Sequence, residues 1–251
     1  MMSEENLKIV SYNIHKGFSR FRRLKVHDLK QKILIWNPDI LFLQEVQGLH
    51  TIHARKKMWP DAAQHEFLAG NDFPFKAYGP NRFYNHGHHG NAILSKYPIL
   101  DINNYDISTS KYEKRGALYC KIEHPIMPVN VLCVHLSLLA KDRKWQYIEI
   151  AKIIENYIKK DEPLIMAGDF NDWKNEADKY LVEKLGLDEI MSQYNNGKLL
   201  RSFPSEFPLL ALDRVYSKNI IPHSASIIKD CSRISDHSPI KADFIIERNT
   251  K

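Results

Sequence analysis

The stretch PLIMAGDFN, residues 163–171, places four consecutive apolar side chains directly before a polar turn. A short, continuous apolar run is typical of a strand covered on both faces, as in α/β proteins. This run ends at Asp169 and Asn171, so its polar side chains stand where the strand ends. Strand ends and the loops that follow them are where such proteins build their functional sites. The stretch therefore predicts a buried strand with a candidate site at its end.

The same pattern recurs along the chain. DILFLQEV, residues 39–46, is a second continuous apolar run, LKIVSYN is expected to form a strand over residues 7–13, and VNVLCVHL over residues 129–136. An acidic, amide or imidazole side chain stands at or near the end of most of these strands, or just before one: Asn13, Glu45, His135, Asp169, Asn171, Asp213, Asp236 and His237. So many polar residues at strand ends are not expected by chance.

The remaining elements complete an α/β pattern. Further strands are expected at residues 90–95, 116–123, 209–216, 225–229 and 240–246. Helices are expected over residues 27–36 and 141–160, the longer one with four apolar residues on one face: Ile148, Ala151, Ile154 and Ile158. The chain contains no repeat, low-complexity segment or linker. We expect one domain over residues 1–251, with a core from residue 7 to residue 246, built as two packed sheets with helices outside.

Composition bounds the class of protein. Hydrophobic residues make up 43% of the 251 residues and charged residues 26%, which is ordinary for a globular protein. The 36 Lys+Arg against 30 Asp+Glu give a net charge of +6, which is compatible with nucleic acid or an anionic membrane surface but requires neither. The basic run RFRRLK, residues 20–25, is expected to be a solvated face.

Cysteine content and hydropathy indicate a soluble, cytoplasmic protein. Three cysteines without closely spaced pairs argue against a disulfide framework and a structural zinc site. Cys120 and Cys133 lie in apolar runs, where buried reduced thiols are expected. No secretory leader is recognisable, and no apolar run approaches the ~18 residues needed to span a bilayer.

The polar residues at the strand ends form one chemical set. Glu45, Asp236 and the Asn13 amide offer hard oxygen ligands, which suit Mg²⁺ or Mn²⁺ better than zinc. His135 and His237 can donate to phosphoryl oxygens. Taken singly, each residue has a simpler explanation as a turn former, a surface carboxylate, a satisfied core histidine or an acceptor of backbone hydrogen bonds. Together they favour metal-assisted attack of water on a phosphoryl centre.

An ordered series of motifs carries a family resemblance. SYNIHKG, LQEV, GNAILSKYPI, KRGALYC, VHL, AGDFND, LDRVY and SDHSPI follow one another between residues 11 and 240. The series resembles the endonuclease/exonuclease/phosphatase superfamily, which includes DNase I, exonuclease III-type AP endonucleases, neutral sphingomyelinases and inositol polyphosphate 5-phosphatases; more narrowly, it looks like an uncharacterised bacterial branch. The resemblance implies a four-layer α/β sandwich of two mixed β-sheets flanked by helices.

The resemblance also implies roles for individual residues. Glu45 is expected to be the principal Mg²⁺ ligand, with Asn13 and Asp236 beside it, and Mn²⁺ is an alternative metal. Asp169 and Asn171 are expected to orient or activate water and to hold the phosphate. His237, supported by Asp213, is expected to contact the phosphate or act in acid–base chemistry. His135 is expected to be a second phosphate contact or the acid.

The class of substrate is left open between three hypotheses. The first is a phosphodiesterase acting on a small or lipid-derived phosphate ester. The second is a DNA or RNA nuclease using the same site. The third, a non-catalytic binding protein, is disfavoured because no position in the polar set looks degraded. His15 stands where AP endonucleases resembling exonuclease III carry an acid, and the cysteines offer none of the disulfides of secreted DNases.

Substrate contacts are expected from the loop YGPNRFYNHGHHGN, residues 78–91. Its three histidines could contact a phosphate or a second metal, or simply form a polar loop. His89, Asn91 and Arg115 are the candidate substrate-binding residues. Arg143 and Gln146 are expected on the surface or in helix packing, and Trp173 is expected to pack beneath the site. Peripheral contact with anionic lipid is compatible with the charge, and no obligate protein partner is evident.

Overall fold

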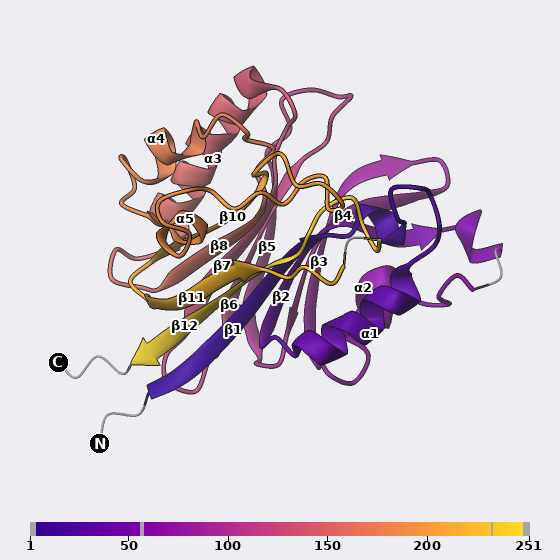
Figure 1. The fold of residues 1–251 in the computed structure, drawn as a ribbon, viewed down its shortest axis with the longest axis horizontal. Helices are drawn as coiled ribbons and strands as arrows, with labels where there is room; N and C mark the ends of the chain where they lie inside the picture. Colours follow the sequence, from indigo (N-terminus) through magenta and orange to yellow (C-terminus); the bar gives the residue numbers. More distant parts are fainter. Residues whose placement is uncertain (1–3, 56–57, 232, 248–251) are drawn as a thin grey trace.

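Two six-stranded β-sheets form the centre of the molecule (Figure 1). The computed structural model describes residues 4–55, 58–231 and 233–247. The first sheet has the order β11-β12-β1-β2-β4-β3, with bounds Ile221–Ile227, Ile240–Glu247, Glu4–Asn13, Ile40–His50, Gly87–Ser95 and Phe75–Tyr84. The second has the order β5-β6-β7-β8-β10-β9, with bounds Ile99–Asp106, Gly116–Ile122, Val129–His135, Leu164–Asp169, Asp213–Lys218 and Asp188–Glu189.

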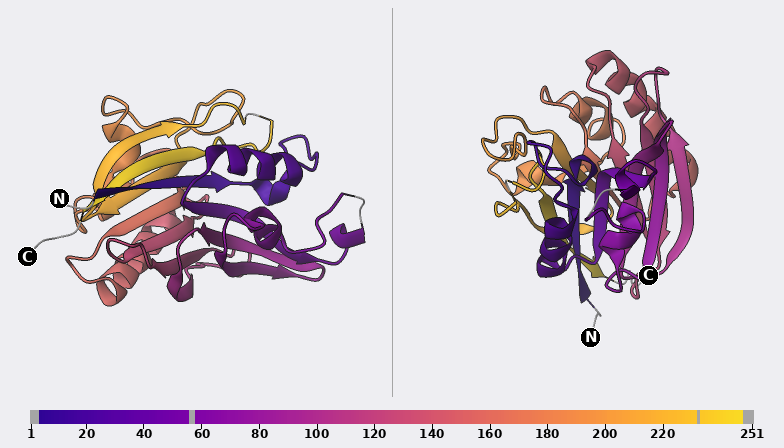
Figure 2. Two further views of the ribbon diagram at one scale, coloured as in Figure 1. Left: turned by 90° about the horizontal axis from the view of Figure 1, so that it is seen from below. Right: turned by 90° about the vertical axis from the view of Figure 1, so that its right-hand side faces the viewer.

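Helices cover the outer faces of the two sheets (Figure 2). The helical elements are η1 (His15–Gly17), α1 (Val26–Trp36), η2 (His53–Arg55), α2 (Gln64–Ala69), α3 (Ala140–Tyr157), α4 (Ala177–Leu181) and α5 (Ile190–Gln193). α1 and α2 pack on the first sheet, and α3 and α4 pack on the second. The expected four-layer α/β sandwich is therefore confirmed. None of the helices within the described residues is long and apolar enough to cross a membrane.

Successive side chains of each strand point to opposite faces of its sheet. The apolar side chains therefore form three buried layers, one between the two sheets and one under the helices on each outer face. In β1, Leu7 and Ile9 point into the core between the sheets, while Val10 and Tyr12 point outward to α1. Successive side chains of a strand face opposite sides of a sheet, so a strand covered on both faces needs apolar residues at every position. This explains why the central strands read as unbroken apolar runs.

Strand register gathers the strand ends that carry the polar residues. β1 and β2 are parallel, with Asn13 paired to Gln44, and β7 and β8 are parallel, with His135 paired to Asp169. β10 is antiparallel to β8 and pairs Asp213 with the same Asp169. All these positions lie at one edge of the sandwich, opposite the edge where Glu4 pairs with Glu247. We call the first of these the site edge.

Several expected elements require correction. The long helix is Ala140–Tyr157, and its buried face carries Arg143, Gln146 and Tyr147 rather than Ile148, which is 44% exposed. Gln146 accepts a hydrogen bond from the backbone N–H of Ser137 in the preceding turn. This contact lets a polar side chain occupy the buried face of the helix, where apolar residues were expected. The expected strand at residues 209–216 is Asp213–Lys218, because the residues before it fold back onto Phe203.

The segment expected to be a substrate-facing loop, residues 78–91, is mainly a β-hairpin. It forms parts of β3 and β4, which pair from Phe75–Ser95 to Tyr84–Gly87. β5 was missed because it is an edge strand in which polar residues interrupt the apolar ones and no residue is buried, which gives little hydrophobic signal. Cys120 and Cys133 are free and buried, as predicted. The basic run at residues 20–25 is largely exposed, also as predicted.

Candidate active site

Glu45 is presented by a β-bulge in β2. Leu43 pairs with Ala92 and Val46 with Gly90, so Gln44 and Glu45 together face the single residue Asn91. Glu45 has a φ of 55°, a left-handed conformation that is uncommon for residues other than glycine. A bulge bends the strand and redirects a side chain. Here it turns Glu45 toward the end of β1.

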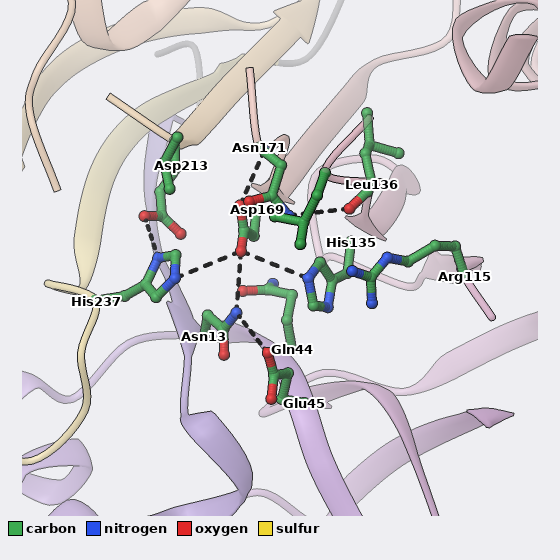
Figure 3. Close-up of polar contacts among 12 residues, drawn as sticks. Asn13, Gln44, Glu45, Arg115, His135, Leu136, Asp169, Asn171, Asp213 and His237 are labelled. Atoms are coloured by element: carbon green, nitrogen blue, oxygen red, sulfur yellow. Dashed lines mark hydrogen bonds and ion pairs between the residues drawn. The ribbon is translucent and has the colours of Figure 1, made fainter. Parts of the chain in front are cut away.

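Asn13 joins the two sheets at the site edge. Its Nδ2 lies 3.0 Å from Asp169 Oδ2 of the second sheet and 3.4 Å from Glu45 Oε1 of the first. Its Oδ1 accepts a hydrogen bond from the backbone N–H of His15. One amide group therefore fixes the separation of two carboxylates that come from different sheets (Figure 3).

His237 lies between two buried carboxylates. Its Nδ1 is 2.8 Å from Asp213 Oδ2 and its Nε2 is 3.6 Å from Asp169 Oδ2. Burial disfavours the charged imidazole, but Asp213 and Asp169 outweigh it and raise the pKa of His237 to about 10. Burial raises the pKa of Asp169 to about 6, although the neighbouring His237 opposes that shift. His237 is thus an imidazolium at neutral pH, beside a carboxylate poised near neutrality.

His135 approaches Asp169 as well. Its Nε2 lies 3.6 Å from the same Asp169 Oδ2. Burial, and next the positive charge of Arg115, lower the pKa of His135 well below its ordinary value, so this imidazole is neutral. Arg115 lies next to His135 in Figure 3 and is held by an ion pair of 2.7 Å with Glu113. The two histidines of the site therefore differ in charge.

Asn171 lies directly after β8, where its φ is 49°. Its backbone N–H donates to Asp169 Oδ1, and its Nδ2 donates to the carbonyl oxygen of Leu136. A non-glycine residue in the left-handed region is a local strain that persists when surrounding contacts fix it. Asn171 thus orients Asp169 from the second sheet, much as Asn13 does from the first.

The carboxylates of Glu45 and Asp236 have the character of a metal site. Each side chain is about one-fifth exposed, and each already faces a basic group: Lys16 Nζ is 3.6 Å from Glu45 Oε2, and His15 Nδ1 is 3.7 Å from Asp236 Oδ1. Burial opposes ionisation of Glu45, but His135, Lys16 and His15 outweigh it and lower its pKa to about 2. Two ionised, partly exposed carboxylates suit Mg²⁺, which keeps several of its waters, and the Asn13 amide would join them by turning its oxygen, now bonded to His15 N–H, toward the ion. Asn13, Glu45 and Asp236 therefore fit a hard divalent cation.

A second group of atoms also has the spacing of a metal site. Ligand atoms of Asp169, Asp213 and His237 lie within 4.8 Å of one another. A histidine flanked by two carboxylates holds a proton on both ring nitrogens and so has no lone pair for a metal. We therefore read this group as an imidazolium that is hydrogen-bonded to Asp213 and ion-paired with Asp169, rather than as a metal site.

The predicted substrate-binding residues do not all lie at the candidate site. His89 lies near Glu45, and burial, followed by Lys16, lowers its pKa to about 4. Asn91 is fully buried, and its Nδ2 donates to the carbonyl oxygens of Gly116 and Cys133. Asn91 therefore links the two sheets, and its assignment to substrate binding was wrong. His88 bonds the hydroxyl of Tyr78 through its ring, which gives it a structural contact.

Trp173 does not pack beneath the site. Its side chain is 46% exposed, with the guanidinium of Arg143 5.1 Å from its ring centre. Arg143 itself is fully buried and faces Asp172, so it supports the turn after β8 from inside. The prediction that Trp173 packs beneath the site was wrong, because the buried Arg143 occupies the position beneath its ring.

Sequence reasoning missed two serines that hold the site in place, and it assigned no role to Gln44, which it placed with Glu45 at the end of a strand. Ser202 donates to Asp213 Oδ2, and Ser235 donates to the backbone oxygen of Asn13. Gln44 is fully buried, with its Nε2 3.2 Å from Ser11 Oγ. Serines are too common to be found by type. Gln44 directly precedes Glu45, and its burial in an apolar run was the one available signal.

Carboxylates, amides and histidines gathered at one edge of a two-sheet sandwich have the chemistry for metal-assisted hydrolysis. The Endonuclease/Exonuclease/phosphatase family matches residues 10–237, and the chain belongs to this family. It is accordingly an enzyme of the phosphoester hydrolase class.

Individual known proteins are similar to the chain in sequence or in fold. The chain is 41% identical over 245 residues to the "Uncharacterized protein YbhP" of Escherichia coli (strain K12), covering 95% of this chain and 96% of that protein. Its fold matches an endonuclease/exonuclease/phosphatase from Beutenbergia cavernae DSM 12333 with a TM-score of 0.76 and 16% identity, covering 95% and 71% of the two chains. A mannosyl-6-phosphatase of Bacteroides thetaiotaomicron matches with a TM-score of 0.71 and 17% identity, over 96% and 100%.

Proposed function

We propose that the chain is a Mg²⁺-dependent phosphodiesterase that acts on a small or lipid-derived phosphodiester by in-line attack of water. The observation that carries this proposal is the position of Asp169 between two imidazoles, each 3.6 Å from its Oδ2. A phosphodiester presents two non-bridging oxygens, and two imidazoles beside one base can each donate to one of them.

Each residue has a definite task in this scheme. Asn13, Glu45 and Asp236 would hold Mg²⁺, which supplies charge neutralisation for the phosphate when it is bound. Asp169, with a pKa of about 6, accepts a proton from the attacking water, and Asn13 and Asn171 hold its oxygens in place. His237 donates a charged hydrogen bond to the phosphate and gives a proton to the leaving oxygen as its P–O bond breaks, so that the alcohol departs neutral.

The division of charge between the histidines supports the scheme. Asp213 keeps His237 protonated, so this residue stabilises the negative charge that builds up on the phosphate oxygens. His135 is neutral and can donate one hydrogen bond without adding a second positive charge beside Asp169. A second cation there would lower the basicity of the carboxylate that must accept the proton.

A nuclease remains the second candidate function, on one specific observation. Residues 14–25, which follow Asn13 at the site edge, contain five Lys or Arg residues and no Asp or Glu. A basic segment beside a phosphoester site is what a nucleic-acid backbone would need.

Hydrolysis of bis(4-nitrophenyl) phosphate, 4-nitrophenyl phosphate and supercoiled plasmid, with Mg²⁺ or EDTA, tests the proposal. We expect hydrolysis of the diester in preference to the monoester, abolished by EDTA. Glu45→Gln should lower kcat/KM by at least about 10³-fold, since a metal ligand and its charge are lost. Glu123→Gln, at an exposed carboxylate on the opposite edge, should be unchanged and serves as the matched control.

Other outcomes decide against the proposal. Plasmid nicking that needs Glu45, with no turnover of the small diester, would favour the nuclease. Activity of Glu45→Gln equal to that of the parent protein would exclude Glu45 from the chemistry and contradict the proposed site.

A further inference from the structure

The site edge is formed by segments that the strand register brings together. β1, β2, β7 and β8 end there, β6 and β10 begin there, and β11 and β12 are joined there. The connecting segments at this edge are residues 14–25, 107–115, 136–144, 170–176, 194–212, 228–231 and 233–239. We call them the site rim. In Figure 1 they lie at the end of the sheets opposite the two termini.

The site rim exposes large apolar side chains. Seven of its residues present side chains that are 46–75% exposed: Phe21, Tyr112, Leu138, Leu139, Trp173, Phe207 and Leu209. The connecting segments at the opposite edge of the described chain, residues 37–39, 96–98, 123–128, 158–163 and 219–220, contain no exposed large apolar side chain, and four single ones lie within two residues of them: Ile35, Leu100, Tyr157 and Ile221. Exposed apolar side chains gathered on one face mark an interaction surface.

The same rim is positively charged. Glu113 and Glu206 are held by Arg115 and Arg20, so these acids of the rim are neutralised. Within the described residues, ten exposed basic side chains of the rim form no ion pair: Arg22, Arg23, Lys111, Lys141, Lys144, Lys174, Lys198, Arg201, Lys229 and Arg233. The rim therefore offers apolar tips surrounded by uncompensated positive charge.

We propose that the site rim docks on an anionic phospholipid membrane. The apolar tips enter the boundary between headgroups and acyl chains, while the Lys and Arg residues contact anionic headgroups. Docking in this orientation faces Glu45 and His237 toward the membrane, so that headgroup phosphodiesters are the substrate. This last step rests on the proposed phosphodiesterase function; the docking itself does not.

Aliphatic tips favour a membrane over a nucleic acid as the partner. Single-stranded nucleic acids bind to aromatic platforms, on which bases stack. The rim also exposes four aromatic side chains, but Leu138, Leu139 and Leu209, which are 56–65% exposed, have no ring for stacking. Burying them in a lipid interface removes apolar surface from water, which a phosphate backbone cannot do.

Sedimentation with vesicles tests the docking. The protein should pellet with vesicles of phosphatidylcholine mixed with phosphatidylglycerol, and less with phosphatidylcholine alone. Added salt should weaken the anionic binding. The double variant Leu138→Ser/Leu139→Ser should lower the partition coefficient by about tenfold or more, because two leucines no longer insert. Leu100→Ser/Ile221→Ser, which changes two similarly exposed side chains at the opposite edge, is the matched control and should bind like the parent.

The design separates docking from catalysis. Glu45→Gln should bind vesicles normally and hydrolyse nothing. Leu138→Ser/Leu139→Ser should hydrolyse the soluble diester normally and lose hydrolysis of phospholipid presented in vesicles. Parent protein that stays in the supernatant, or equal loss in both double variants, would overturn the docking whatever the catalytic result. Binding to single-stranded DNA without binding to anionic vesicles would overturn it in favour of a nucleic-acid partner.

Discussion

Asp169 is the residue on which the site converges. It pairs in register with His135 and Asp213 on neighbouring strands, and it accepts from Asn13 of the other sheet. Its neighbours determine its charge as much as its own burial does. A change at any of them should therefore act through the proton affinity of Asp169 as well as through lost contacts.

His237 gives the stability of the protein a dependence on pH. Its pKa is raised from the ordinary value of 6.5 to about 10 in the folded state, so the folded chain holds one more proton than the unfolded chain between these values. The stabilisation is fully present below pH 6.5 and is lost as the pH rises toward 10, by up to about 1.4 kcal/mol per pH unit. Urea unfolding in EDTA should show this slope in the parent and a flatter one in His237→Gln.

A histidine on the surface provides the comparison for that measurement. His223→Gln changes an exposed side chain of β11 and should keep the slope of the parent. If His237→Gln and the parent lost stability in parallel above pH 6.5, the imidazolium between Asp213 and Asp169 would not exist in the folded protein.

Sequence order identified the chemistry better than the exact positions of the side chains. Asp169 and His135 could be chosen because they stand at the ends of apolar runs, and His237 because it stands just before one; the fold then brings the three together. The amide of Asn91 also follows a glycine in an apolar run, yet its donors are satisfied between the sheets. Residue type and local pattern cannot distinguish an amide that faces solvent from one that links two buried backbones.

The bulge in β2 shows what a single strand does not reveal about itself. In a regular strand the side chain of Glu45 would face the side of the sheet opposite to those of Gln44 and Val46. Only the pairing of Leu43 and Val46 with β4 shows that the bulge changes this direction. Bulges are defined by two strands rather than one, so local sequence carries little signal for them. The edge strand β5 was missed for a related reason, because none of its residues is buried.

The contact between β7 and β8 permits one specific prediction. A Cβ at Gly168 would lie 1.9 Å from the backbone oxygen of Val134, its partner in the register. Gly168→Ala should therefore push the two strands apart and lower the free energy of unfolding by about 3 kcal/mol or more, or the Tm by roughly 6–12 °C.

An open position controls for the change of residue. A Cβ at Gly197 would meet nothing within 4 Å, although the φ there is 73°. Gly197→Ala should cost about 1 kcal/mol, the usual effect of a left-handed backbone without glycine. Equal effects at both positions in thermal unfolding would refute the close approach of β7 and β8.

At the scale of the molecule, one core joins both sheets. Phe42 of β2 and Val131 of β7 belong to the same buried cluster, which also includes residues of β8 and β12. We therefore expect the chain to unfold as one domain. Native-state hydrogen exchange in rising urea should bring amides of β2 and β7 to one common free energy of opening. Two separate limiting values would show that the sheets unfold independently and contradict a single domain over residues 1–251.

The position of β12 has a consequence for the growing polypeptide. β12 lies between β11 and β1 and pairs with both, although β1 begins the described chain and β12 ends it. During synthesis, one edge of β1 stays unpaired until β12 has left the ribosome. Asp236 and His237 stand just before β12, so they arrive with the strand that closes the sheet. A nascent chain therefore brings Asp236 and His237 beside Asn13 and Asp169 only once β12 has been made and can pair with β1.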